Sequence, residues 1–198
     1  MVSDKFCLGA PFTVNSKENP QCAYGLSKYQ AEKGLSKISH ETSLETAIVR
    51  IPLVYGPGVK GNLNTLIKIL SLGFPLPMAS IKTNLRSMIG IDNLISVMST
   101  CVWHPNAKNE TFLVSDNHDI STYTLVSLLG KSIEKKPLLI KFPVSLISLI
   151  AKIFKKDAEV KKLLSSLQVD VSYTCKQLDW KPPVTVIDGF KKMIIEQH

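Results

Sequence analysis

Apolar and polar positions along the chain follow first a helical and then a strand period. Apolar side chains recur every three or four residues over residues 23–39, which predicts a helix. Residues 46–54 (TAIVRIPLV) are apolar and β-branched and end at Tyr-Gly-Pro-Gly, which predicts a buried strand. Helical spacing returns over residues 62–72, and Gly73 and Pro75 end it. This part of the chain is therefore predicted to run helix, strand, helix.

Short strands and helices alternate through the rest of the chain. Further strands are predicted at residues 86–91, 111–115 and 138–142, with a short extended piece at 167–170. Helices are predicted at residues 93–103, 121–131, 143–156 and 158–164, and from residues 172 and 185 onward. The expected N-cap side chains are Asp92, Ser121 and Ser172. This alternation predicts an α/β protein.

Composition describes an ordinary globular chain. Its 198 residues suffice for one domain with a sizeable core or for two small domains. The formal net charge is +8, but the lysine pairs are spread over the second half and aromatic residues make up only 7%. A nucleic-acid interface usually concentrates its basic residues and interleaves them with aromatics, so nucleic-acid binding is not favoured.

Cysteine and histidine positions predict neither a metal site nor a disulfide framework. The four cysteines are widely separated, with no Cys-x-x-Cys pair, and the histidines are isolated. Dispersed thiols are typical of the reducing cytoplasm, which is the compartment that we expect.

One apolar segment raises the question of a membrane. Residues 142–156 (FPVSLISLIAKIFKK) are too short for the roughly 20 residues of a spanning helix. They suit a buried helix with lysines at its C-terminal end. An amphipathic helix lying on an anionic surface is the alternative, which we favour less. The first residues also lack the long apolar core of a signal peptide.

Tyr24-Gly-Leu-Ser-Lys28 is the most informative short motif. In a helix, positions i and i+4 lie on one face, so the phenol and the ammonium can point into one pocket. A cation beside a phenol stabilises the phenolate, which makes a base able to take a proton from a hydroxyl. By itself the spacing is weak evidence, because a surface lysine packed over a tyrosine ring has the same pattern.

Longer motifs give this pentapeptide a context. PQCAYGLSKYQAEKGL is followed by AIVRIPLVYGPGVKGN, then by NLRSMIGIDNL, and finally by SLQVD and LDWKPP. In this order the motifs resemble the extended short-chain dehydrogenases/reductases, the NAD-dependent epimerase/dehydratase family, over about residues 11–190. The implied fold is α/β: the C-terminal part of a Rossmann-type extended short-chain dehydrogenase/reductase plus its small substrate-binding α/β domain. Residues 1–60 would belong to the dinucleotide-binding domain and 61–198 mainly to the substrate domain, with about 84–115 returning to the Rossmann sheet.

The resemblance implies a cofactor site for NAD or NADP. Tyr24 would be the catalytic base and acid, and Lys28 would hold the nicotinamide ribose and assist the tyrosine. The strand end that would lie against the nicotinamide consists of Pro52, Leu53, Val54 and Tyr55. No Gly-x-Gly-x-x-Gly follows a strand in this chain, and the family's catalytic Ser or Thr cannot be assigned. We therefore expect an N-terminally truncated chain that does not turn over alone.

The resemblance also implies a nucleotide-sugar site. Asn62, at the start of its helix, would lie near the phosphates, Arg86 would pair with the diphosphate, and Lys162 would replace an arginine expected there. The structural alternatives are that Asn62 only caps its helix and that Arg86 is an exposed edge charge.

The implied reaction is an NAD(P)-dependent change at C4 of a UDP-sugar. UDP-glucose 4-epimerases tend to carry Asn where this chain has Leu53. The motifs LVYGPGVKGN and SLQVD also resemble those of bacterial enzymes that reduce UDP-4-keto-6-deoxy-N-acetylhexosamines in surface polysaccharide synthesis. A homodimer is compatible with the resemblance. The alternatives are a non-enzymatic remnant or interaction module and, less favoured, a peripheral membrane protein.

Overall fold

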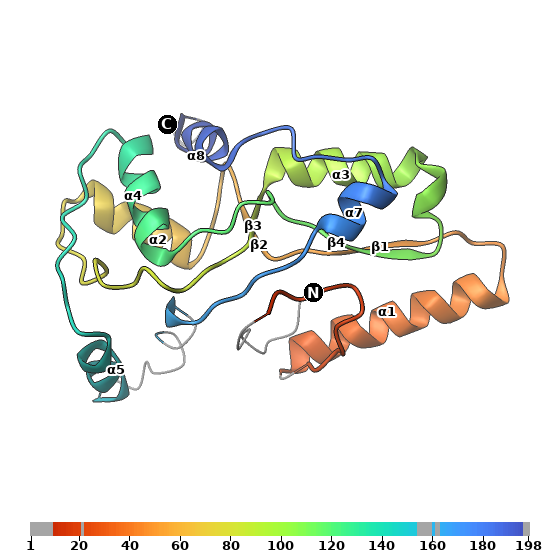
Figure 1. Ribbon diagram of the computed structural model, residues 1–198, viewed down its shortest axis with the longest axis horizontal. Coiled ribbons are helices and arrows are strands. Elements are labelled where there is room, and N and C mark those ends of the chain that lie inside the picture. The colour runs from red at the N-terminus through yellow and green to blue at the C-terminus, as the bar shows by residue number, and fades with distance from the viewer. Residues whose placement is uncertain (1–9, 21, 154–159, 161–162, 196–198) are drawn as a thin grey trace. The chain divides into compact units, whose positions relative to one another are not determined.

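The strand predicted at residues 46–54 forms as two short strands in the computed structural model, β1 (Ala47–Arg50) and β2 (Leu53–Tyr55) (Figure 1). Pro52 lies between them and has no N–H to donate to a ladder, which explains the interruption. β1 pairs in parallel with β4 (Glu110–Leu113), with Arg50 opposite Leu113. β2 pairs with β3 (Met88–Gly90). These four strands thus form two two-stranded sheets.

The structure describes residues 10–20, 22–153, 160 and 163–195, and the chain divides into two compact units. The first unit consists of Met1–Val54, Ser87–His118 and Leu167–Val186. The second consists of Tyr55–Arg86, Asp119–Ser166 and Ile187–His198. Each unit is therefore assembled from three separate segments of the chain.

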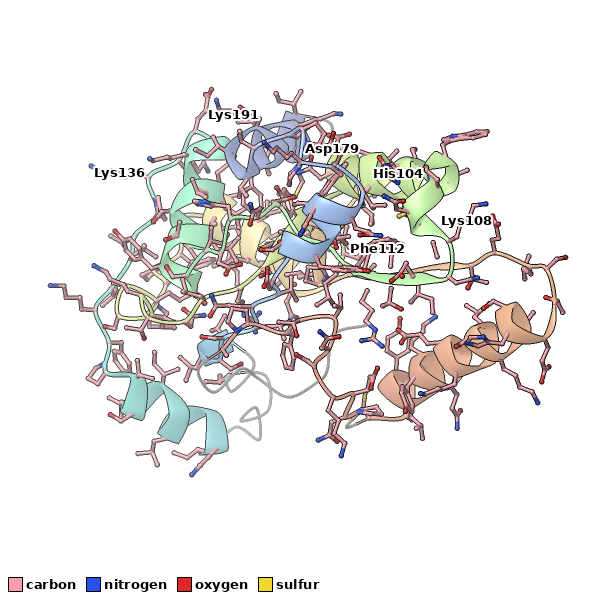
Figure 2. All side chains as sticks on the ribbon, turned by 45° about the vertical axis from the view of Figure 1, so that its right-hand side comes forward. His104, Lys108, Phe112, Lys136, Asp179 and Lys191 are labelled. Atoms are coloured by element: carbon pink, nitrogen blue, oxygen red, sulfur yellow. The ribbon has the colours of Figure 1, made fainter. Side chains whose placement is uncertain are left out.

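Helices cover the strands of the first unit. They are α1 (Ala23–Glu41), α3 (Ile91–Trp103), the short 3-10 turn η1 (Pro105–Ala107) and α7 (Ser172–Gln177). Figure 1 shows α1 and α3 on opposite sides of the β1–β4 pair. The core lies between the strands, α3 and α7; Phe112 of β4, labelled in Figure 2, is fully buried there and stacks on Tyr173 with ring centroids 6.1 Å apart.

The second unit is mainly helical. Its helices are α2 (Asn62–Ser71), α4 (Thr122–Ser132), α5 (Val144–Ile153) and α8 (Val186–Ile195). α2 packs on α4 and buries Leu63, Ile67 and Leu70, which recur at helical spacing. Tyr55 and Phe190 of α8 are fully buried and stack with their centroids 4.4 Å apart. Among the residues that the structure describes, no helix is long and apolar enough to cross a membrane.

Several predicted elements begin or end elsewhere. Asp92 does not cap α3, which begins at Ile91 with Gly90 as its N-cap. Ser121 does cap α4, and its hydroxyl accepts a hydrogen bond from the Thr124 N–H at 3.0 Å. Ser172 is the first residue of α7 rather than its cap, and its N–H donates to Asp170.

The strand predicted at residues 138–142 is reduced to a single parallel bridge between Leu76 and Leu139. Prolines at positions 75, 77, 137 and 143 flank both partners, and proline has no N–H with which to extend the pairing. The helix predicted at residues 158–164 lies largely outside the described residues.

Candidate active site

Tyr24 and Lys28 lie side by side on α1. The helix begins at Ala23, and the Sγ of its N-cap residue, Cys22, accepts a hydrogen bond from the Gly25 N–H at 3.3 Å. The Lys28 ammonium lies over the Tyr24 ring, 5.6 Å from the ring centroid. Tyr24 is an exposed residue, with 58% of its surface accessible to solvent. The i, i+4 spacing has brought the phenol and the cation together as predicted.

A pocket of the first unit extends along α1 from Gly25 to Glu32. It is lined by Lys28, Tyr29 and Glu32 of α1, by Arg50 and by residues of the segment 12–20. Thr13 of this segment lines the same pocket, and its N–H donates to the Ser16 hydroxyl at 2.9 Å. Residues 12–20 have no regular hydrophobic pattern, so their contact with α1 could not be predicted from the sequence.

Arg50, the last residue of β1, is the centre of an ion-pair cluster in this pocket. Its Nε donates to both carboxylate oxygens of Glu32, at 3.2 and 3.1 Å. Its Nη2 donates to Glu32 Oε2 at 2.7 Å and to Glu18 Oε1 at 2.8 Å. Arg50 is only 9% exposed, so the two carboxylates satisfy a buried guanidinium.

Hydrogen bonding within this cluster shifts the pKa values of Arg50 and Glu18. The pKa of Arg50 is raised: burial by itself would lower it, but the hydrogen bonds to Glu32 and Glu18 outweigh that. The hydrogen bond from Arg50 lowers the pKa of Glu18. Sequence reasoning missed Arg50, Glu32 and Glu18, and the only signal was a charged residue inside an otherwise apolar strand.

The residues that follow Arg50 at the end of the strand differ in their exposure to solvent. Pro52 and Val54 are half-buried, and Leu53 is 45% exposed. Tyr55 is 1% exposed and packs on Phe190, and a Cβ on Gly189 would come within 2.8 Å of its hydroxyl. The Tyr55 ring is therefore a core side chain of the second unit.

The residues expected to bind a nucleotide sugar belong to the second unit. Asn62 is the exposed first residue of α2, and the N-cap before it is Gly61, whose φ is 71°. Asn62 is thus not the helix cap. Gly61 has no side chain with which to cap the N–H groups of the first turn, and these can attract an anion.

Arg86 is half-buried, so it is not an exposed edge charge. Its Nε donates to the Ser165 carbonyl at 3.4 Å, and its backbone bridges Ile120. Burial lowers the pKa of Arg86, which stays a cation at neutral pH. Lys162 lies outside the described residues.

The described part of the chain shows no cluster of metal ligands, and two of its cysteines are partly buried. No group of three or more His, Cys, Asp or Glu side chains there is arranged to hold a metal ion. Burial raises the pKa values of the Cys101 and Cys175 thiols, which makes both less reactive.

The family model described as "NAD dependent epimerase/dehydratase family" matches residues 8–115, more than half of the chain. The chain belongs to this family. The match contains the Tyr24–Lys28 pair, the Arg50 cluster and both two-stranded sheets. The resemblance inferred from the motifs is therefore confirmed.

Relatives of known activity and solved structures agree with this assignment. A UDP-glucose 4-epimerase from Vibrio cholerae is 43% identical over 185 residues, which is 93% of this chain and 56% of that protein. A UDP-glucose 4-epimerase structure from Thermotoga maritima, solved with UDP-glucose, superimposes with a TM-score of 0.70 at 19% identity and covers 94% of this chain and 56% of that one. A UDP-glucuronic acid 4-epimerase from Bacillus cereus in complex with NAD gives 0.69 at 20% identity, with 94% and 54% covered.

The two structural comparisons confirm the predicted fold, a part of a Rossmann-type α/β protein. The chain spans little more than half the length of these proteins.

Proposed function

We propose that this chain carries the Tyr–Lys catalytic pair and nucleotide-sugar-binding residues of an NAD(P)-dependent epimerase that acts at C4 of a UDP-sugar. The observation that carries the proposal is the exposed Tyr24 with the Lys28 ammonium 5.6 Å from its ring centroid. The family of the chain and its 43% identity to a UDP-glucose 4-epimerase support this reaction over others that use the same pair.

The residues present fit a dinucleotide. Lys28 is exposed and offers three N–H donors to ribose hydroxyls, and the open Tyr24 hydroxyl is beside it. Pro52, Leu53, Val54 and the Tyr55 backbone are the proposed contacts of the nicotinamide. When bound, NAD or NADP supplies hydride acceptance and return at the sugar C4.

Tyr24 and Lys28 handle the proton in this scheme. Tyr24 takes the proton of the C4 hydroxyl as the hydroxyl becomes a ketone and gives it back when the hydroxyl re-forms. Lys28 supports this exchange, because its positive charge favours the phenolate that Tyr24 is before it takes the proton and becomes again after it returns the proton.

Binding of the nucleotide sugar is assigned to the second unit. Asn62 and the uncapped first turn of α2 are proposed to contact phosphate oxygens. Arg86 is proposed to pair with the diphosphate, a task that suits a half-buried guanidinium. Lys162 would add a further positive charge. We accordingly infer that the first unit is the dinucleotide side of the protein and the second the sugar side.

A second candidate reaction rests on Leu53, which is exposed at the strand end. Asn tends to occupy this place in UDP-glucose 4-epimerases, so an apolar residue favours reduction of a UDP-4-keto-6-deoxy-N-acetylhexosamine. In that case the enzyme would serve surface polysaccharide synthesis in the cytoplasm. Tyr24 would then only donate a proton, to the keto oxygen.

The binding part of the proposal can be tested on the 198-residue chain without a cofactor. We expect UDP-glucose and UDP to bind in isothermal titration calorimetry, and Arg86→Met to weaken both at least about tenfold, because a charge-assisted pair is lost. Lys37→Met, which removes an exposed ion pair on α1, is the control and should bind normally. Absence of binding, or equal binding by Arg86→Met, would contradict the assignment.

A further inference from the structure

Arg50 binds two carboxylates in a pocket that Lys28 also lines. The side chains of Arg50, Glu18, Glu32 and Lys28 all line one pocket. Both carboxylates are held by the guanidinium, Glu32 through three contacts of 2.7 to 3.2 Å and Glu18 through one of 2.8 Å. The Lys28 ammonium instead lies over the Tyr24 ring.

The helix offers Glu32 another partner. Glu32 follows Lys28 by four residues in α1, and side chains at this spacing can meet. An ammonium that is paired with a carboxylate favours a neighbouring phenolate less, because the negative charge cancels most of its field. The effect of the Lys28 charge on Tyr24 therefore depends on whether Glu32 pairs with Arg50 or with Lys28.

Strand β1, which carries Arg50, holds the guanidinium in place through its pairing with β4. Arg50 is paired opposite Leu113, which is 2% exposed and whose carbonyl accepts a hydrogen bond from the Thr174 hydroxyl at 2.6 Å. By contrast, α1 contributes no buried residue among those that the structure describes. The arginine thus belongs to the core of the unit, and the carboxylate of the helix binds to it.

We propose that Arg50 is a positioning residue for the Tyr24–Lys28 pair: by binding Glu32 and Glu18 it keeps both carboxylates away from Lys28. The charge of Lys28 is then free to act on the Tyr24 hydroxyl. This inference rests on the proposed function, since it concerns how the pair is kept ready for proton transfer. The raised pKa of Arg50 and the lowered pKa of Glu18 agree with it.

The reactivity of the Tyr24 hydroxyl tests the inference without cofactor or turnover. The rate of acetylation of Tyr24 by N-acetylimidazole, located by peptide mass spectrometry at mildly alkaline pH, reports the phenolate. Lys28→Met should slow it about fivefold, and Arg50→Met should slow it nearly as much, because the released Glu32 pairs with Lys28. The double variant Arg50→Met with Glu32→Gln should return toward the unmodified rate. Lys37→Met on the same helix should change nothing.

Each pattern of rates has a separate meaning. A normal acetylation rate in Arg50→Met overturns the inference. A double variant as slow as Arg50→Met overturns it too, because Arg50 would then act only by holding α1 in place. A normal rate in Lys28→Met overturns the catalytic pair itself, and with it the proposed function. Should Arg50→Met fail to fold, Arg50→Lys keeps one charge without the fork that binds two carboxylates, and an intermediate rate is expected.

Discussion

At the scale of single residues, Arg50 shows how a charge inside an apolar strand becomes part of the fold. Its side chain is 11% exposed and that of Glu32 16%, while Glu18 is 38% exposed. A buried ion pair adds little over a well-packed apolar pair, but removing one member leaves the other charge without compensation. The cost of a single substitution is therefore larger than the net contribution of the cluster.

Arg50→Met should lower the free energy of unfolding by about 3 kcal/mol, the low end for a broken buried pair because Glu18 is partly solvated. Urea denaturation followed by circular dichroism measures this. Lys37→Met, which breaks the exposed Lys37–Glu41 pair of α1, should cost no more than about 0.5 kcal/mol. Similar midpoints for the two variants would show that the cluster does not stabilise the unit.

The same cluster predicts a pH dependence. The folded-state pKa of Glu18 lies below its ordinary value of 4.5, because Arg50 donates a hydrogen bond to the carboxylate. Its contribution is therefore complete above pH 4.5 and is lost as the pH falls through the folded-state pKa. Over this acid range, the melting temperature of Glu18→Gln should fall less than that of the unmodified chain. Glu41→Gln, from the exposed pair, should follow the unmodified profile; an identical slope for Glu18→Gln would be evidence against the prediction.

At the scale of elements, two glycines within helices show what packing adds to local propensity. A Cβ on Gly189 of α8 would come within 2.8 Å of the Tyr55 hydroxyl and 2.9 Å of its ring, and Tyr55 is itself fully buried. A Cβ on Gly34 of α1 would meet nothing within 4 Å. The sequence presents both as ordinary helix glycines.

Gly189→Ala should therefore destabilise the protein by about 1–3 kcal/mol, since the overpacked Tyr55 ring has to move. Gly34→Ala should stabilise it by roughly 0.5–1 kcal/mol, because alanine has the higher helix propensity and its methyl group meets no obstacle. The melting temperatures of the two variants show whether each substitution stabilises or destabilises the protein. If Gly189→Ala also raises the melting temperature, the close contact with Tyr55 is not a constraint on α8.

At the scale of the whole molecule, the two units alternate along the chain, so neither is a continuous stretch of sequence. Both tryptophans, Trp103 and Trp180, belong to the first unit, so their fluorescence reports that unit alone. The residues proposed to bind the nucleotide sugar, Asn62 and Arg86, belong to the second.

UDP-glucose at a hundred times its Kd should raise the free energy of unfolding by about 2.7 kcal/mol. Because each unit is built from three segments joined through the other, we expect the fluorescence transition in urea to shift together with the circular dichroism transition. Arg86→Met at the same ligand concentration is the control. A shift confined to circular dichroism would mean that the units unfold independently.

Local signals were sufficient for most helices and for the spacing of Tyr24 and Lys28. Hydrophobic periodicity and the Ser121 cap located α1, α2 and α4 within a few residues, because helix hydrogen bonds join residues only four apart. The strands were less predictable. The interruption at Pro52 and the single bridge at Leu139 depend on which N–H groups a partner strand needs, and that partner lies far along the chain.

By itself the sequence determined the family, the α/β class and the pair on one face of α1, since these follow from local patterns and from the order of short motifs along the chain. Only the tertiary structure decided that Arg50 binds the distant carboxylates of Glu32 and Glu18 and that Tyr55 is a core side chain. It also decided that Arg86 is half-buried. Burial and ion pairing are properties of the assembled environment, in which the cost of desolvating a charge is set against the partners that folding brings to it.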